Sequence, residues 1–255
     1  MRIFAVSDLH VDYRENARWV SEISRVDFTD DVLILAGDIS DSLERIERTI
    51  RSMAERFKKV LYVPGNHDLW VLRSKGVANS FDKFEKVRAA VEESGASLDT
   101  FHGRTTTIVP LLGWYDYTFG EPSAELRRRW MDYRACRWPA EMLERDVTEH
   151  FTGLNEPVPR PENPVVISFS HFMPRIDLMP TFAPQRARFL LPILGTELLE
   201  QQIRRIGSSI HIYGHSHVNR RAVRDGVVYI NNAYGYPSEG YITAKRLLCV
   251  HEDAA

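Results

Sequence analysis

The chain contains very few cysteines and no long apolar run. Cys136 and Cys249 are the only two cysteines among its 255 residues. Two distant thiols exclude a disulfide framework and a thiolate metal site, so we expect a reducing, cytoplasmic compartment. No apolar stretch approaches the roughly 20 residues of a membrane-spanning helix, so no membrane partner is expected. We also expect no signal peptide, because Asp8 and His10 belong to the site described below.

Neither sign of charge is in excess. The 33 basic and 35 acidic side chains give a formal net charge of −2. This balance carries no electrostatic sign of a nucleic-acid surface. Hydrophobic residues make up 44% of the chain, enough for a substantial core. The length and composition together predict one domain over residues 1–255.

Five short apolar segments each end in polar side chains that can bind metal ions. The segments are rich in β-branched residues, which indicates buried strands. They span residues 3–6, 32–36, 60–63, 165–169 and 210–213. The polar side chains that follow are Asp8, His10, Asp38, Asn66, His67, His171, His215 and His217. At one edge of a sheet, these oxygen and nitrogen donors would suit two divalent ions such as Mn, Fe or Zn.

The first part of the chain alternates strand and helix patterns. Apolar residues from Leu43 to Phe57 recur at helical spacing, and helices are also predicted over 14–25 and 83–93. A βαβαβ order favours parallel neighbouring strands. After Thr105 the pattern changes to further strands, with a hairpin predicted at Asp225-Gly226.

Two irregular stretches interrupt this scaffold between ligand-bearing strand ends. The first, at about 113–164, is rich in aromatic residues, and the second, at about 172–194, is rich in proline. Connections of this length are usually functional, so we expect both to border the active site. Trp114 and Tyr115 have two interpretations: a stacking wall for substrate, or ordinary core residues.

The ordered polar blocks resemble those of the calcineurin-like metallophosphoesterase superfamily. The blocks are Asp8-Leu9-His10, Gly37-Asp38, Gly65-Asn66-His67-Asp68, His171 and Gly214-His215-Ser216-His217. The resemblance implies an α/β fold: a four-layer α/β/β/α sandwich of two mixed β-sheets flanked by helices. It also implies a metal-dependent phosphohydrolase that acts on a phosphodiester or a small phosphomonoester.

The resemblance further implies a role for each polar residue. One ion would be held by Asp8, His10, Asp38 and His217, and the second by Asp38, Asn66, His171 and His215. Asp38 would bridge the two ions together with a hydroxide that attacks phosphorus in line. His67 would be catalytic, facing the substrate and stabilising the transition state or protonating the leaving oxygen.

Asp41 has two interpretations that do not exclude each other. The resemblance offers it as the carboxylate that orients His67. Its position also suits the cap of the following helix, a role that Ser42 can fill equally well. Asp68 is interpreted as structural.

Departures from related branches narrow the function. Phosphoprotein phosphatases carry arginines where this chain has Ser42 and Gly65, so phosphoprotein substrates are not favoured. One alternative is a non-catalytic scaffold with the same fold, which predicts lost ligands, and here every ligand is present. Another is a nuclease, which the balanced charge disfavours. The sequence does not determine the substrate, the metal pair or the oligomeric state.

Overall fold

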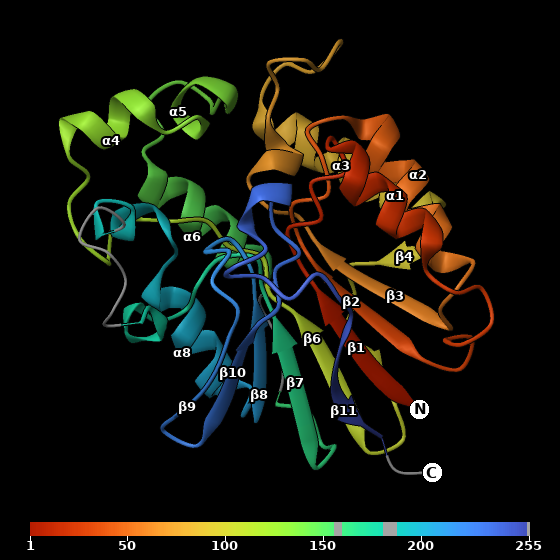
Figure 1. The fold of residues 1–255 in the computed structure, drawn as a ribbon. Coiled ribbons are helices and arrows are strands. Elements are labelled where there is room, and N and C mark those ends of the chain that lie inside the picture. Colours follow the sequence, from red (N-terminus) through yellow and green to blue (C-terminus); the bar gives the residue numbers. More distant parts are fainter. Residues whose placement is uncertain (156–159, 181–187, 254–255) are drawn as a thin grey trace.

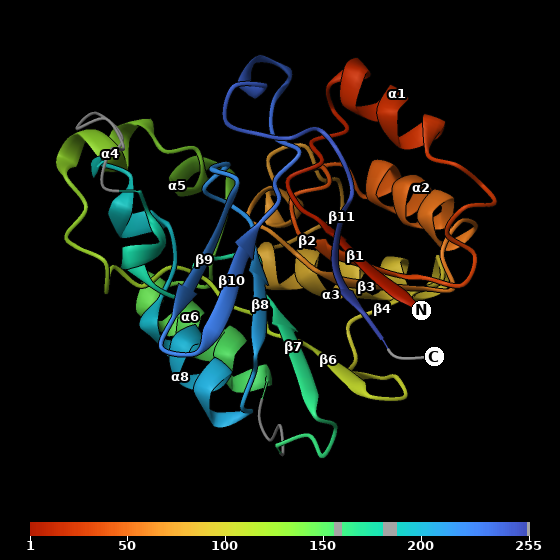
Figure 2. The same ribbon diagram turned by 60° about the horizontal axis from the view of Figure 1, so that its bottom comes forward.

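Two β-sheets lie face to face and helices cover the outer side of each (Figures 1 and 2). The computed structural model describes residues 1–155, 160–180 and 188–253, so parts of both irregular stretches, 156–159 and 181–187, lie outside the described residues. No helix within the described ranges is long and apolar enough to cross a membrane.

The first sheet has the strand order β11-β1-β2-β3-β4. Its strands are β1 (Arg2–Val6), β2 (Val32–Ala36), β3 (Lys59–Val63), β4 (Ala96–Ser97) and β11 (Leu248–Glu252). Strands β1 to β4 are parallel, as the alternating pattern predicts, and β11 is antiparallel to β1.

The second sheet has the order β5-β6-β7-β8-β10-β9. Its strands are β5 (Phe101–His102), β6 (Thr106–Pro110), β7 (Val165–Phe169), β8 (Ile210–Tyr213), β9 (Arg220–Arg224) and β10 (Val227–Asn231). The four central strands are parallel, whereas β5 and β9 are antiparallel edges. Asp225 and Gly226 form the predicted β9–β10 hairpin.

Helices form the two outer layers. Helices α1 (Arg14–Glu22), α2 (Leu43–Ala54) and α3 (Ser80–Glu93) cover the first sheet, and α6 (Glu144–Leu154) and α8 (Glu197–Arg205) cover the second (Figure 1). The shorter elements are α4 (Ala124–Arg129), α5 (Asp132–Ala135), η1 (His67–Leu69), η2 (Ile176–Leu178), η3 (Leu191–Ile193) and η4 (Pro237–Glu239). The predicted helices differ at their ends: the first stops at Glu22, and the third begins at Ser80, where the Asn79 side chain caps it.

Strand side chains alternate between two cores, because successive residues of a strand point to opposite faces. Ile3 and Ile34 pack between the sheets against Ile167. Their strand neighbours Phe4 and Leu33 pack outward against the helices. The four-layer sandwich implied by the family resemblance is therefore confirmed.

The two halves of the aromatic-rich stretch differ in what they contact. Trp114 and Tyr115 are 0% and 1% exposed and belong to the core on the outer side of the second sheet. Their interpretation as core residues is confirmed. Helices α4 and α5 follow, and α5 reaches the edge where the polar strand ends meet.

Candidate metal centre

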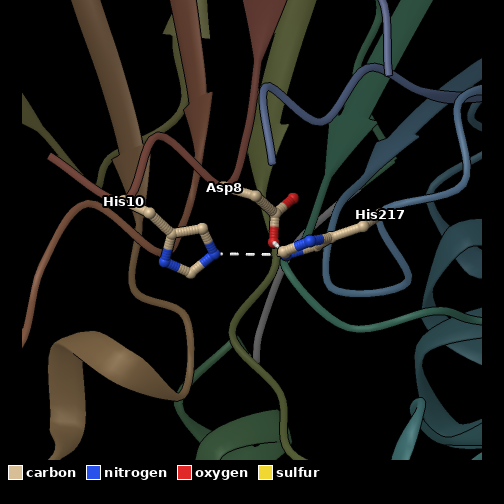
Figure 3. Close-up of side chains that lie close together, drawn as sticks. All are labelled: Asp8, His10 and His217. Atoms are coloured by element: carbon tan, nitrogen blue, oxygen red, sulfur yellow. Dashed lines mark hydrogen bonds and ion pairs between the residues drawn. The ribbon is translucent and has the colours of Figure 1, made fainter. Parts of the chain in front are cut away.

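The structure brings the predicted ligands together at the carboxyl ends of the parallel strands. Donor atoms lie within 4.8 Å of one another in three groups: Asp8 with His10 and His217, His10 with Asp38 and His67, and Asp38 with His171 and His215. Asn66 joins the third group, because its Oδ1 lies 3.2 Å from Nε2 of His171. Figure 3 shows Asp8, His10 and His217, from opposite ends of the chain, pointing at one another.

Unusual backbone geometry aims these side chains. Nine described non-glycine residues have a positive φ, and five of them are predicted ligands: Asp8, His10, Asp38, His215 and His217, with φ from 42° to 64°. Such left-handed positions cost on the order of 1–3 kcal/mol each and persist only where neighbouring contacts hold them. Here the N–H of Asp8 donates to the Gly37 carbonyl (2.9 Å), and that of His10 to the Asp38 carbonyl (3.0 Å).

Glycine is required where the ligand loops touch. A Cβ atom on Gly65 would lie 2.1 Å from Oδ1 of Asp38, and one on Gly37 would lie 2.5 Å from Nδ1 of His171. Gly37 also has a φ of +85°, which side-chain-bearing residues rarely adopt. Both glycines precede ligands in the sequence blocks, and the close approach explains why.

Asp68 fastens the same two loops together. Its buried carboxylate accepts hydrogen bonds from the backbone N–H groups of Asp38, Ile39, Ser40 and Gly65, at 2.8–3.0 Å. Because both carboxylate oxygens are used by backbone donors, Asp68 has the structural role expected from the sequence.

On one side of the centre, His217 lies between two carboxylates. Its Nδ1 donates to Oε2 of Glu239 at 2.6 Å, and its Nε2 lies 3.1 Å from Oδ1 of Asp8 and 3.2 Å from Nε2 of His10. Burial alone would lower the pKa of His217, but Asp8 and Glu239 outweigh it and raise the pKa to about 10. With this raised pKa, Nε2 carries a proton as well, and a metal ion bound at Nε2 would replace it.

On the other side, backbone carbonyls determine which nitrogens carry protons. Nδ1 of His171 lies 2.9 Å from the Ala36 oxygen, and Nε2 of His215 lies 2.9 Å from the Ile193 oxygen. A carbonyl only accepts, so each of these nitrogens carries the hydrogen. Burial lowers the pKa of both histidines, which keeps the rings neutral. Their other nitrogens are therefore lone-pair donors, and they face each other at 3.1 Å.

Asp38 lies between the two sides. Its Oδ2 is 3.5 Å from Nε2 of His171 and 3.9 Å from Nε2 of His10. Burial, with the nearby carboxylates of Asp68 and Asp8, raises the pKa of Asp38 well above its usual value. A divalent cation would reverse that shift, since it favours the ionised carboxylate.

This donor set fits divalent metal ions. Lone pairs of two neutral histidines and an amide oxygen converge on one point beside the Asp38 carboxylate. Such convergence is unfavourable without a cation, and the mixture of nitrogen and oxygen donors suits Mn, Fe or Zn.

His67 lies at the rim of this cluster and is partly exposed. Its ring stacks on Trp70 with the centroids 3.8 Å apart, and its Nε2 lies 3.5 Å from the Tyr236 hydroxyl. Burial and the neighbouring His171 lower its pKa to about 3. Its distances to His10 and Asp38 would also allow a ligand role, but its partial exposure favours contact with substrate.

The contacts of Asp41 are with groups other than the predicted partner, His67. Its Oδ2 lies 3.4 Å from Nε of Arg73, and its backbone oxygen accepts from the Lys83 ammonium at 2.9 Å. Ser42, the alternative considered above, is the cap of α2. The orienting role of Asp41 toward His67 stays a prediction. The His67 ring is packed by Trp70, which stacks on it, and by the edge-on ring of His10.

Sequence reasoning missed three further residues that contact the predicted site. Glu239 fixes His217, Trp70 stacks on His67, and Asp132 accepts from Asn66. None of them stands at a sequence spacing that is typical of metal ligands. Only Trp70, three residues after His67, is close enough in sequence to have been suspected.

Comparison with known proteins gives a consistent result. A family model described as calcineurin-like phosphoesterase matches residues 1–219. The acyl-carrier-protein phosphodiesterase PptH of Mycobacterium tuberculosis is 27% identical over 266 residues, covering 93% of this chain and 78% of the relative. The crystal structure of phosphopantetheinyl hydrolase (PptH) from that organism has a TM-score of 0.78 at 25% identity, covering 94% of this chain and 91% of that one. TT1561 of Thermus thermophilus shares the fold alone, with a TM-score of 0.50 at 16% identity over 97% of both chains.

Proposed function

The chain belongs to the calcineurin-like phosphoesterase family, whose members include metal-dependent phosphohydrolases. From this premise we propose that its substrate is the phosphopantetheinyl diester of an acyl carrier protein. Hydrolysis would form a bond from a water oxygen to phosphorus and break the bond from phosphorus to the serine oxygen. The products would be free phosphopantetheine and the unmodified carrier protein.

The extent of the similarity to PptH carries this proposal. It covers 93% of this chain and so includes both irregular stretches, which we expected to border the active site. A carrier-protein substrate is larger than the small phosphoester expected from the sequence, but the bond to be broken is the same kind. A cytoplasmic location and a single domain over residues 1–255 are part of the proposal, and both cysteines are free thiols.

We assign the metal ligands as the family resemblance implies. Asp8, His10, Asp38 and His217 would hold one ion, and Asp38, Asn66, His171 and His215 the other. When bound, two divalent ions supply Lewis acidity that neutralises phosphoryl charge and lowers the pKa of a bound water.

His67 would serve the leaving group. The departing serine oxygen must gain a proton, and the partly exposed His67 ring lies where such an oxygen can approach. A neutral imidazole keeps one N–H, which can donate to that oxygen. A bound phosphodiester anion would also raise the low pKa of His67, since an adjacent negative charge favours the imidazolium.

Mass spectrometry of a holo acyl carrier protein tests the proposal directly. The purified protein is incubated with the carrier and Mn²⁺, and we expect loss of the phosphopantetheinyl mass from the carrier. Bis(p-nitrophenyl) phosphate and p-nitrophenyl phosphate serve as a plain diester and a plain monoester. Cleavage of the plain diester with an intact carrier would overturn the proposed substrate but keep phosphodiester hydrolysis. Cleavage of the monoester alone would overturn both the proposed substrate and phosphodiester hydrolysis.

A further inference from the structure

Asp132 is a buried carboxylate in helix α5 of the aromatic-rich stretch. The residue is 2% exposed, and its two carboxylate oxygens accept three side-chain N–H groups. Oδ1 accepts from Nδ2 of Asn66 at 2.9 Å and from Nε1 of Trp70 at 2.7 Å. Oδ2 accepts from Nε1 of Trp130 at 2.7 Å.

Each of these three donors contacts a different part of the metal centre. Asn66 is itself a predicted ligand, with Oδ1 turned toward His171. Trp70 stacks on His67 at an interplanar angle of 26°. Trp130 lies edge-on to His215, with ring centroids 5.9 Å apart. One carboxylate therefore connects, through its donors, with a predicted ligand, with the predicted catalytic histidine and with a second ligand ring.

We propose that Asp132 is a positioning residue: it fixes the amide of Asn66 so that the carbonyl oxygen faces the metal ion, and it fixes the ring of His67 through Trp70. The inference rests on the metal binding of the proposed function and does not depend on the substrate. The aromatic-rich stretch thus contributes to the assembly of the centre as well as bordering it.

The chemistry of Asn66 explains why this position needs a carboxylate. An asparagine side chain can rotate so that its NH₂ and oxygen exchange places, and only the oxygen can bind a cation. Oδ1 of Asp132 is an acceptor, so it attracts the Asn66 NH₂ and repels the Asn66 oxygen. The favoured orientation places the Asn66 oxygen beside the lone pair of His171, as observed.

An apolar side chain of similar size at position 132 would lose this selection. Asp132→Asn could keep an oxygen facing Asn66 and Trp70, but Asp132→Leu keeps no acceptor. Without Oδ1, nothing at position 132 would distinguish the NH₂ of Asn66 from its oxygen. Without Oδ2, the partly buried indole N–H of Trp130 would lose its partner.

A purely structural role is the competing explanation, because α5 is also tied to the neighbouring loops. The N–H of Val71 donates to the Ala135 oxygen at 2.8 Å, and that of Ser80 to the Arg137 oxygen at 2.7 Å. These backbone bonds hold α5 in place without the Asp132 side chain. Metal affinity, measured on folded protein, separates positioning from structural support.

Calorimetric titration with Mn²⁺ of the metal-free wild type and of Asp132→Leu is the test. We expect two ions to bind the wild type and one of them to bind the variant about 10- to 100-fold more weakly. Asp116→Leu is the matched control: it removes another carboxylate of the same stretch, one that contacts Thr118 and Thr196, and should bind both ions normally. Unchanged affinity for both ions in folded Asp132→Leu would overturn the inference, whereas failure of the wild type to bind metal would overturn the proposed function.

Trp70→Phe tests the second part of the inference, the positioning of His67, and does so even if Asp132→Leu does not fold. It keeps the aromatic ring but removes the N–H that Asp132 holds. We expect both ions to bind as in wild type while kcat on bis(p-nitrophenyl) phosphate falls several-fold with little change in KM. Wild-type kcat in this variant would overturn the positioning of His67.

Discussion

Nε2 of His171 faces Nδ1 of His215 at 3.1 Å, and neither nitrogen carries a proton. The protons lie on the opposite sides of both rings, where backbone carbonyls hold them. Two lone pairs at this distance repel each other, and a cation between them removes the repulsion. The backbone of β2 and of η3 thus prepares the centre for a metal ion, since Ala36 and Ile193 supply the two carbonyls.

Asp38→Ala should remove the link between the two ions. Asp38 is the carboxylate that approaches both groups of ligands, so its loss should weaken binding of both ions. Elemental analysis after gel filtration is expected to find less than one ion per chain. Asp12→Asn is the control, because Asp12 lies on the loop after His10 and bonds to Ser40 instead of the centre. Full occupancy in Asp38→Ala would contradict the assignment.

His67→Ala should separate metal binding from catalysis. We expect two bound ions and a loss of about 10²- to 10⁴-fold in kcat on a phosphodiester, the usual contribution of general acid catalysis. Elemental analysis and steady-state kinetics on one preparation measure both quantities. Loss of an ion would show instead that His67 is a ligand, which its distances to His10 and Asp38 permit.

Glu239→Ala should weaken metal binding on the side of His217. The Glu239 carboxylate holds the proton on Nδ1 of His217 and leaves Nε2 for the metal. Loss of such an outer partner typically costs about 10- to 100-fold in metal affinity. Titration with Mn²⁺ measures the change. Glu239→Gln should recover most of the affinity, because its amide oxygen still accepts the hydrogen bond; equal weakening in both variants would point to charge as the cause.

The ligands were predictable from sequence because strand patterns and donor residues are local features. Asp8, Asp38 and Asn66 each follow an apolar strand, and parallel strands place their carboxyl ends at one edge. The layers of the sandwich, by contrast, were implied by the family resemblance and not by the strand patterns alone.

The supporting residues were not predictable, because their role depends on contacts between distant segments. Asp132 is 66 residues from Asn66 in sequence, and no spacing rule links them. Glu239 lies in a short turn whose approach to His217 follows from the path of the chain after β10. The left-handed backbone at Asp8 and His215 was equally hidden, since neither residue type requires it.

Asp253 joins the two sheets away from the metal centre. It follows β11 of the first sheet, and its buried carboxylate accepts from the backbone N–H groups of Arg104 and Thr105 and from the hydroxyls of Thr105 and Thr106 at the start of β6. Burial would raise the pKa of Asp253, but these hydrogen bonds outweigh it and lower the pKa below its usual value. The charged carboxylate is therefore favoured in the folded state.

Asp253→Asn should destabilise the protein in a pH-dependent way. A group whose pKa is lowered on folding adds stability above its unfolded pKa, and that stability is lost as the pH falls through the folded pKa. We expect the variant to lose about 1–3 kcal/mol at pH 7, the usual cost of leaving buried donors unsatisfied. The difference from wild type should shrink once the pH falls below about 4, where an unfolded carboxyl is protonated. Urea unfolding at pH 7 and at about pH 3 measures it.

Two comparisons make this prediction specific. Asp30→Asn changes an exposed carboxylate and should alter the free energy of unfolding by less than about 0.5 kcal/mol at either pH. Mn²⁺ affinity should stay at the wild-type value in folded Asp253→Asn, because the ligand loops are held by Asp68 and by bonds within their own edge. A destabilisation of the same size at both pH values would mean that the charge of Asp253 does not contribute, and that only the shape of its side chain does.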